Sequence, residues 1–412
     1  MAASAFPRSL VPAFNRRHSA PRRGRALGNN AKNCPPLNLK GVFPSSESGS
    51  ADGWVTDPVT GETRPEKPGT SAEARAERFA LKSHVAELLP NSRTAKCLWR
   101  RCASKVDVMR DKSHGKAFFR GLQTCSSVWA CPVCAAKIAE RRRVELTGAM
   151  ACADELGLQV SLITLTVPHG LGDDIRAMLD QLGKAWRFMT HGKQSDAMWR
   201  FLGRVGFVRA LEVTDGPHGF HPHFHILLFT RHGPPVDVMQ GILSAAWVLA
   251  CVKAGLPVPH GVYGCRVDDG SKAAAYVAKG SGWGLECEMT KSHLKRSRSD
   301  KGHSPLDLLR ASFYDDDKRA RARWLIYADA FHGRRQLFWS VGLKKLLAVV
   351  DLTDEEIVAA ESEKATVVYS LDADQWRLVI RCKAEALILS YAETRLDALP
   401  LLLTRLAAIP DG

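Results

Sequence analysis

The sequence predicts an α+β protein with an antiparallel sheet flanked by helices, and three observations support this fold class. The strand-like runs FVRALEV and HFHILLF lie on either side of the turn sequence DGPHGF, which predicts a hairpin. A third strand-like run, VSLITLTVPH, precedes them. Helical patterns flank these strands, as expected where helices pack on a sheet.

The length and charge of the chain point to several structural units and an acidic polymer as partner. The 412 residues include 58 Lys and Arg against 43 Asp and Glu, a formal charge of +15. Such an excess favours DNA or RNA over a small acidic metabolite. Basic tails also serve solubility or membrane contact, so the charge alone is weak evidence.

Residues 1–72 are rich in Pro, Gly, Ser and Arg and lack an apolar period, so we expect a disordered basic tail. The first forty residues also resemble a transit peptide, but Pro7, Pro12 and Pro21 interrupt any long amphipathic helix. An upstream start codon is the other interpretation of this tail. With no membrane-spanning stretch or secretory signal expected, the prediction is a soluble, cytoplasmic protein without a membrane partner.

The remaining chain divides into three predicted ranges. Residues 73–157 form a helical and zinc-binding segment, with a helix from Ser71 towards Pro90 and another over 135–156. Residues 158–350 carry the three strands, helices over 175–189, 238–253 and 316–331, a strand in GVYGCRV and a short helix in SKAAAYVAKG. Residues 351–412 are predicted to be a small separate α+β unit: a capped helix at TDEE, a strand pair (ATVVYSL and WRLVIR) and two Leu-rich helices.

The strand HPHFHILLF carries His221, His223 and His225 at alternate positions, so their imidazoles share one face. Folding the hairpin about Pro217 and His218 sets Glu212 opposite His223, and a slip of one residue would turn the carboxylate away. Two imidazoles and a carboxylate suit Mg²⁺ or Mn²⁺. His221 is the least secure ligand because some such sites use two histidines, and ordinary surface histidines are the alternative.

In SKAAAYVAKG, Ser271 caps a predicted helix that Gly280 ends. Lys272, Tyr276 and Lys279 fall on one face of it. Two ammonium groups beside the phenol favour the phenolate, whose ordinary pKa is about 10, and also attract a phosphate. Taken alone, this segment is better interpreted as a short amphipathic helix with an ordinary tyrosine.

Three cysteines form a C-x5-C-P-x-C knuckle: Cys125, Cys131 and Cys134. We expect Cys102 to complete a structural Zn²⁺ site of four thiolates, with Cys97 or His114 as rival fourth ligands. Small buried cysteines without metal are the alternative.

Several basic residues are candidates for contact with the DNA backbone, beside Trp283 as a stacking platform: Lys272, Lys291, Lys295, Arg296 and Arg298. Arg141, Arg142 and Arg143 form a second basic run. Charge runs are usually solvated faces, so neither run assigns an individual contact.

Three segments in this order, SLITLTVPH, HPHFHILLF and YVAKG, resemble the three motifs of rolling-circle plasmid replication initiators of the HUH endonuclease superfamily. The stretches GLQTCSSVWACPVCAAKI and HGRRQLFWSVGL are also similar to bacterial members. The resemblance covers residues 75–350.

The resemblance implies an HUH-type sheet, a metal that polarises the scissile phosphate and a nucleophilic tyrosine. His223 and His225 match the His-hydrophobe-His motif, His221 its leading histidine, Tyr276 the nucleophile and Lys279 the trailing lysine. Glu212 lies where related enzymes place an acidic ligand. The implied partner is a single-stranded or hairpin plasmid origin, and a host helicase and polymerase would act with the protein.

One departure concerns termination, because Lys272 stands where several relatives carry a glutamate that activates water; Asp268 and Asp269 are candidate substitutes. Three alternatives remain open. The first, an HUH transposase or relaxase, would use the same chemistry, although a relaxase usually places its tyrosine before the histidines. The second is a zinc-stabilised DNA-binding regulator without catalysis. The third, a lactamase-type metallohydrolase, lacks its HxHxDH pattern because Leu227 and Leu228 follow His225.

Overall fold

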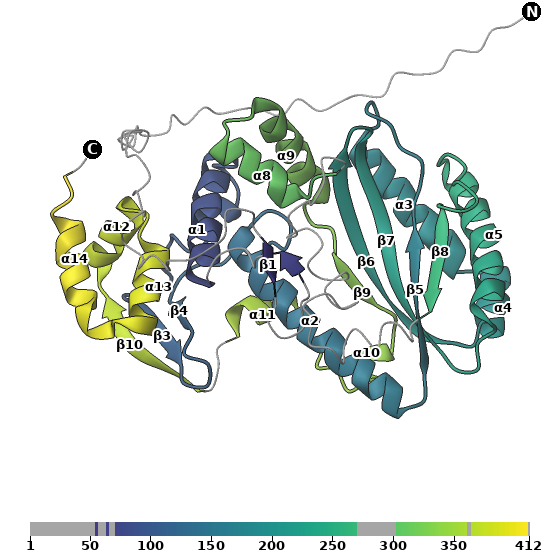
Figure 1. Cartoon of the computed structure of the whole chain (residues 1–412), viewed down its shortest axis with the longest axis horizontal. Coiled ribbons are helices and arrows are strands. Elements are labelled where there is room, and N and C mark those ends of the chain that lie inside the picture. The colour runs from purple at the N-terminus through teal and green to yellow at the C-terminus, as the bar shows by residue number, and fades with distance from the viewer. Residues whose placement is uncertain (1–53, 57–62, 66–70, 270–301, 361–363, 411–412) are drawn as a thin grey trace, which may run out of the picture.

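The computed structural model describes residues 54–56, 63–65, 71–269, 302–360 and 364–410. Figure 1 shows a five-stranded sheet at one end of an elongated molecule and a smaller sheet at the other. The helix α2 (Pro132–Glu155) runs between them.

The larger sheet has the strand order β8-β5-β7-β6-β9, and all of its neighbours are antiparallel. Its strands are β5 (Gln159–Leu165), β6 (Arg204–Gly216), β7 (Gly219–Thr230), β8 (Cys265–Asp269) and β9 (Leu337–Trp339). The predicted α+β class and antiparallel sheet are therefore confirmed.

Helices cover both faces of this sheet, because apolar side chains of β7 point alternately to its two faces. Phe224, Ile226 and Leu228 join the core formed with α3 (Ile175–Thr190) and α5 (Val236–Ala254). Leu227 and Phe229 face the other way, onto α2 and α10 (Leu343–Leu346). The histidines belong to this second face, at the opposite end of β7. The sequence did not predict α4 (Lys193–Phe201), which follows α3.

The tip of the β6–β7 hairpin is held by the segment that follows residue 301. Backbone groups of Asp215 and His303 pair at 2.6 and 2.8 Å. Two helices follow, α8 (Pro305–Tyr314) and α9 (Lys318–Phe331). Arg323 of α9 lies 3.7 Å from the Phe220 ring centroid, and its Nε donates to Asp215 at 3.1 Å. Charge and ring contact together fix the hairpin beside the histidines.

The smaller sheet has the order β10-β3-β4, from β3 (Val106–Asp111), β4 (Ala117–Arg120) and β10 (Ala365–Leu371). Because β10 pairs with β3, the C-terminal segment shares a sheet with residues 106–120, and its description as a separate unit was wrong. The positions of the domain boundaries stay a prediction. A short 3-10 helix, η1 (Thr94–Lys96), precedes β3.

The end of the chain is mainly helical. The predicted cap of α11 (Asp354–Ala359) is present as a reciprocal pair between Thr353 and Glu356. The run WRLVIR was predicted as a strand and instead lies in α12 (Ala373–Arg381). Its Trp376 and Val379 are buried three positions apart, a helical spacing, and Asp372 caps the helix. Two helices match the predicted Leu-rich pair, α13 (Glu385–Thr394) and α14 (Leu399–Ala407), joined by η3 (Leu396–Ala398).

Within the predicted disordered tail, β1 (Trp54–Thr56) pairs with β2 (Thr63–Pro65), so residues 1–72 are not wholly without regular structure. The rest of that range lies outside the described residues, apart from the start of α1 (Ser71–Leu88).

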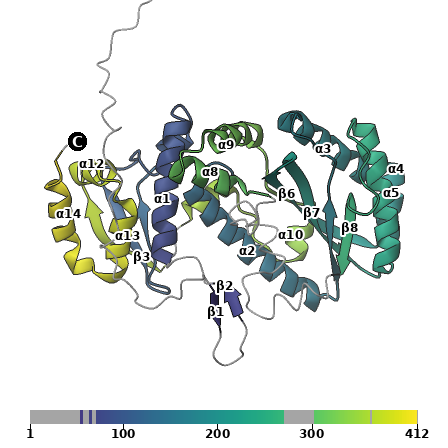
Figure 2. The ribbon, with the colours of Figure 1, turned by 45° about the horizontal axis from the view of Figure 1, so that its top comes forward.

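A buried ion pair joins α1 to the C-terminal helices. Lys82 and Glu385 each have a side chain 1% exposed, and Nζ lies 3.2 Å from Oε1. Lys82 also donates to the Cys97 carbonyl at 3.3 Å, and Trp99 Nε1 donates to Glu385 at 3.3 Å. Figure 2 shows α1 standing between the two halves of the molecule, with α13 beside it. This contact therefore links three separate stretches of chain.

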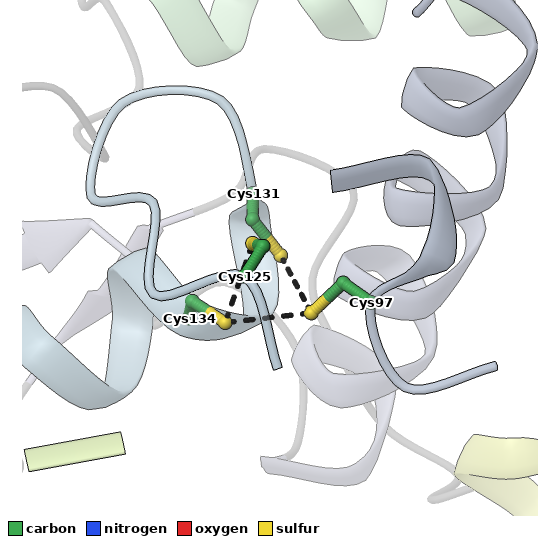
Figure 3. Close-up of side chains that lie close together, drawn as sticks. All are labelled: Cys97, Cys125, Cys131 and Cys134. Atoms are coloured by element: carbon green, nitrogen blue, oxygen red, sulfur yellow. Dashed lines mark hydrogen bonds between the residues drawn. The ribbon is translucent and has the colours of Figure 1, made fainter. Parts of the chain in front are cut away.

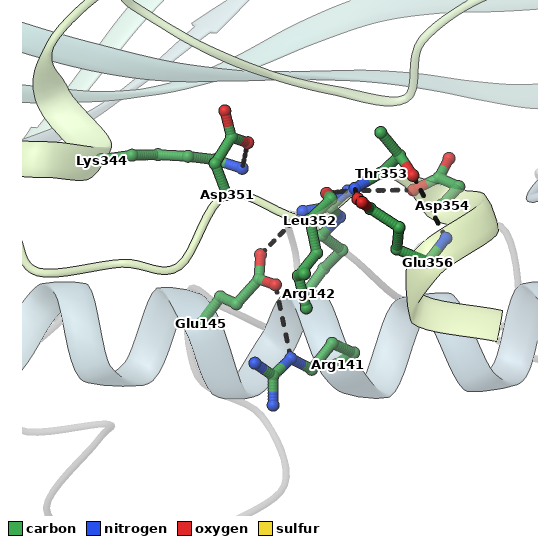
Figure 4. Close-up of polar contacts among 9 residues, drawn as sticks. All are labelled: Arg141, Arg142, Glu145, Lys344, Asp351, Leu352, Thr353, Asp354 and Glu356. Carbon is green, nitrogen blue, oxygen red and sulfur yellow. Dashed lines mark hydrogen bonds and ion pairs between the residues drawn. The ribbon is translucent and has the colours of Figure 1, made fainter. Parts of the chain in front are cut away.

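A second polar group ties α2 to the start of the C-terminal segment (Figure 4). Arg142 bonds Glu145 at 2.8 Å, the Leu352 carbonyl at 2.7 Å and Asp354 at 3.1 Å. Its side chain is 11% exposed. Arg142 is therefore a structural residue, and the basic run 141–143 does not present three free cations to DNA.

The Lys82 pair gives a stability prediction. Lys82→Met leaves the Glu385 carboxylate buried without its cation, which should lower the free energy of unfolding by about 3–5 kcal/mol. Urea unfolding followed by tryptophan fluorescence measures this loss. The control Lys82→Met/Glu385→Leu removes both charges and should recover most of it; a double variant as unstable as the single one would contradict the explanation.

Candidate functional site

The register of the β6–β7 hairpin brings a carboxylate to the histidine strand. Glu212 pairs directly with His223, as the hairpin predicted, and the pairing continues to Gly216 and Gly219 at the turn. Gly219 has φ +95°, and a Cβ there would lie 2.9 Å from the Gly170 carbonyl oxygen. Glycine at this turn position therefore lets the hairpin turn pack closely against the loop that follows β5.

Three side chains converge into a group that could hold a metal ion. Glu212 Oε2 lies 3.0 Å from His225 Nε2 and 3.4 Å from His223 Nε2. All three donor atoms lie within 4.8 Å of one another. The side chains are 10–14% exposed, so little water reaches them. Two imidazole nitrogens and a carboxylate oxygen on one side match a divalent site with open positions.

The other ring nitrogens are held by the surrounding chain. His223 Nδ1 donates to the His221 carbonyl at 3.1 Å, and His225 Nδ1 lies 3.1 Å from Thr164 Oγ1. A neutral His223 that donates through Nδ1 has a lone pair on Nε2, directed at the Glu212 oxygen. Two lone pairs at this distance repel unless a proton or cation lies between them. Such outer contacts orient metal-ligating histidines.

The electrostatics of Glu212 agree with this arrangement. Burial opposes ionisation, but the adjacent imidazoles of His223 and His225 outweigh it and hold the pKa of Glu212 well below its ordinary value. Glu212 Oε2 is also buried without a hydrogen bond of good geometry. The carboxylate is thus ionised and short of donors, which is the condition that a cation satisfies.

His221 was predicted as a third imidazole ligand, but it lies outside the three-residue group. Its Nδ1 is 3.0 Å from Nδ1 of His169, at the end of the segment following β5, so one of these nitrogens carries a proton. Burial and the nearby His223 and His169 lower the pKa of His221 to about 3. Sequence reasoning missed His169; its signal was its place as the last residue of SLITLTVPH.

A second group of potential metal ligands lies at the start of α2. Figure 3 shows the Cys97, Cys125, Cys131 and Cys134 thiols directed at one point. Neighbouring sulfurs are 3.5, 3.7 and 3.8 Å apart. Four thiols at such spacing surround a volume suited to one tetrahedral ion.

The fourth thiol belongs to Cys97, so the prediction of Cys102 as the fourth ligand was wrong. Cys102 is exposed and absent from the group, whereas Cys97 is fully buried. The rival His114 is 63% exposed and lies 3.5 Å from Asp111. Leu98 and Ser126, each following a cysteine of the group, have φ of +54°, so both turns hold a conformation that non-glycine residues rarely adopt. The Ser127 amide donates to Cys125 Sγ at 3.5 Å.

The remaining predicted site residues lie outside the described residues: Lys272, Tyr276, Lys279, Trp283, Lys291, Lys295, Arg296 and Arg298. Both candidate water-activating acids end β8. Asp268 lies on the same face of the sheet as the histidines, because it pairs with Leu162, which in turn pairs with Leu227. Its carboxylate accepts a hydrogen bond from Arg266 at 2.6 Å. Asp269 is directed at the opposite face, by the alternation of the strand.

Substitution of the cysteines tests the second group. Cys97→Ala should reduce the bound zinc of the purified chain by about one equivalent, because a four-thiolate site loses a ligand. Cys102→Ala is the matched control and should retain the metal. Elemental analysis by mass spectrometry measures both; equal zinc in the two variants would contradict the assignment of Cys97.

Calorimetric titration with Mn²⁺ tests the first group. Glu212→Gln and His225→Ala should each weaken binding by more than about tenfold, because each removes a direct ligand. His218→Ala, an exposed histidine at the hairpin turn, is the control. Unchanged Mn²⁺ affinity in both site variants would rule out this group as the binding site.

Comparisons with known proteins bear on this part of the chain. Residues 116–234, which include β4 to β7, match a family described as replication protein. A protein named "Protein rep" from Streptomyces lividans is 26% identical over 308 residues, covering 59% of this chain and 67% of that protein. A "Neomycin resistance protein" from Streptomyces cyanogenus is 29% identical over 139 residues, covering 28% and 32% respectively.

No solved structure matches the chain significantly. The matched region contains Glu212, His223 and His225 together with three of the four clustered cysteines. Residues 116–234 of this chain are therefore similar to the replication-protein family, and the Streptomyces lividans protein extends that similarity beyond this region.

Proposed function

We propose that this chain initiates plasmid replication by nicking one DNA strand, through a covalent 5′-phosphotyrosine on Tyr276 and with Mg²⁺ or Mn²⁺ held by Glu212, His223 and His225. One observation carries the proposal: these three donors converge on one face of the hairpin, within the region that matches the replication-protein family. Zn²⁺ at the four cysteines would brace the segment before it.

The residues present fit a divalent ion on chemical grounds. The Glu212 oxygen is buried and lacks a hydrogen bond of good geometry, and the Nε2 atoms of His225 and His223 lie 3.0 and 3.4 Å from it. When bound there, the metal would neutralise charge on the scissile phosphate.

The reaction would be carried by Tyr276. Its phenolate oxygen forms a bond to phosphorus while the bond from phosphorus to the 3′ oxygen breaks, leaving a phosphotyrosine and a free 3′-hydroxyl. Lys272 and Lys279 would favour the phenolate and hold the phosphate. A later 3′-hydroxyl can attack the phosphotyrosine and reseal the strand, which restores the phenol.

Chain connectivity permits Tyr276 to reach the histidines. In the paired rows of the sheet, Arg266 of β8 lies beside Thr164 of β5, which pairs with His225. Asp269 is three residues further along β8, about 10 Å from Arg266, and β8 lies two strand spacings, about 10 Å, from β7. The seven residues from Asp269 to Tyr276 can span at most roughly 25 Å, which exceeds the return distance.

The proposed partner is a single-stranded or hairpin plasmid origin in a bacterial cytoplasm, with a host helicase and polymerase acting after the nick. The formal charge of +15 supports a DNA partner. Trp283 and the basic residues up to Arg298 are proposed to hold the strand.

A labelled single-stranded origin tests the reaction. Incubation with Mn²⁺ should give a protein-linked 5′ end and a free 3′ end, and Tyr276→Phe should abolish the adduct because it lacks the attacking oxygen. Glu212→Gln and EDTA should reduce it at least a hundredfold. Denaturing gels after protease digestion measure the adduct.

Two outcomes would favour other functions. Origin binding without an adduct, unchanged by Tyr276→Phe, would indicate a zinc-stabilised regulator without catalysis. An adduct formed on transposon ends or a transfer origin, and not on a plasmid origin, would indicate an HUH transposase or relaxase.

A further inference from the structure

The outer face of α5 carries an apolar stripe that the described chain leaves uncovered. Its members are exposed and recur every three or four residues: Val238, Gly241, Ala245, Leu249 and Val252. At 100° per residue they fall within one narrow side of the helix. Leu249 is 67% exposed and Val252 55% exposed. Exposed apolar stripes of this kind mark contact surfaces.

The opposite side of α5 is fixed in the core. Met239, Leu243, Trp247 and Cys251 are buried there, in the cluster that includes β7. Among the described residues α5 is the one helix apolar and long enough to cross a membrane, and 28% of that window is buried. Because one side of α5 is packed against the protein, we interpret its exposed side as a contact surface and not as part of a membrane-spanning helix.

We propose that this stripe is the contact surface between two copies of this chain, packed with their α5 helices antiparallel about a two-fold axis at Ala245. The stripe is symmetric about that residue, with members four and then seven positions away on each side. An antiparallel pair thus places Val238 against Val252 of the second copy, and Ala245 against Ala245. A two-fold contact requires such self-complementarity.

Side-chain size supports the same arrangement. The symmetry places Gly241 opposite Leu249 of the second copy, so the smallest member faces the largest. A Cβ built on Gly241 would meet nothing within 4 Å, so space above it is open. Small residues at Gly241 and Ala245 let two helices approach closely, and a protruding leucine fills the gap beside them.

Charge favours the antiparallel direction over the parallel one. The charged residues of α5, Asp237 and Lys253, lie at opposite ends, each eight positions from Ala245. An antiparallel pair brings Asp237 of one copy and Lys253 of the other to the same end, together with opposite ends of the two helix dipoles. A parallel pair would bring like charges together. A membrane surface would instead select a row of basic residues beside the stripe, and α5 has Lys253 alone.

The mass of the full chain in solution tests the proposal. Sedimentation equilibrium should show a concentration-dependent rise from 45.2 kDa towards twice that mass. Ala245→Arg and Leu249→Arg should each weaken association more than tenfold while circular dichroism stays unchanged. The matched control is Leu401→Arg, also at an exposed leucine, on α14 at the far end of the molecule (Figure 1). The control should associate like the wild type.

Cysteine cross-linking tests the direction. Ala245→Cys should link to itself, whereas Val238→Cys should link to Val252→Cys in a mixture and not to itself. The wild-type chain under the same treatment accounts for its native cysteines. Self-linking of Val238→Cys would overturn the antiparallel arrangement.

Two other results would overturn the surface itself. One is a wild-type chain that stays monomeric up to about 100 µM, well above the Kd of a micromolar complex; binding of that monomer to phosphatidylglycerol vesicles, lost in Ala245→Arg, would assign the stripe to a membrane. The other is a dimer that Ala245→Arg leaves intact. None of these experiments uses the strand-nicking assay of Tyr276, so a failure of the dimer proposal can be distinguished from a failure of the proposed function.

Discussion

The pairing register of β6 with β7 is the constraint on which the candidate metal group depends. Side chains alternate along a strand, so a shift of one residue would turn Glu212 away from His223 and His225 together. Several contacts oppose such a shift. β5 and β9 pair on the two outer sides of the hairpin, and Arg323 and His303 hold its tip at Asp215. The group of donors is therefore positioned by regular structure, which is more precise than a loop.

The neighbouring layers keep that hairpin both supported and accessible. Apolar residues on one face of β7 are covered by α3 and α5, and those further along the other face by α2. The histidines occupy the end of β7 where side chains are polar, and they stay 10–14% exposed. A site that is nearly dry strengthens electrostatic attraction for a cation, yet leaves open positions for a ligand.

Buried polar contacts connect the site-bearing half to the rest of the chain. Cys97 contributes a thiol to the cluster at the start of α2, while its carbonyl accepts from Lys82, which pairs with Glu385 near the C-terminus. Arg142, on the same α2, holds the segment at Leu352 and Asp354. Because buried charges are costly when unpaired, these contacts hold the C-terminal helices to the N-terminal segment, although the sequence predicted two separate units there.

The sequence by itself determined the features that depend on neighbours along the chain. The alternation of histidines, the hairpin that opposes Glu212 to His223, the knuckle of three cysteines and the cap at Thr353 all follow from local spacing. Only the tertiary structure decided which distant residue completed each group: Cys97 in place of Cys102, His169 beside His221, and β10 against β3. It also decided that WRLVIR is a helix, since alternating apolar residues in a short run fit either period until packing selects one. Contacts between distant segments depend on how the whole chain packs, and spacing in one sequence does not encode them locally.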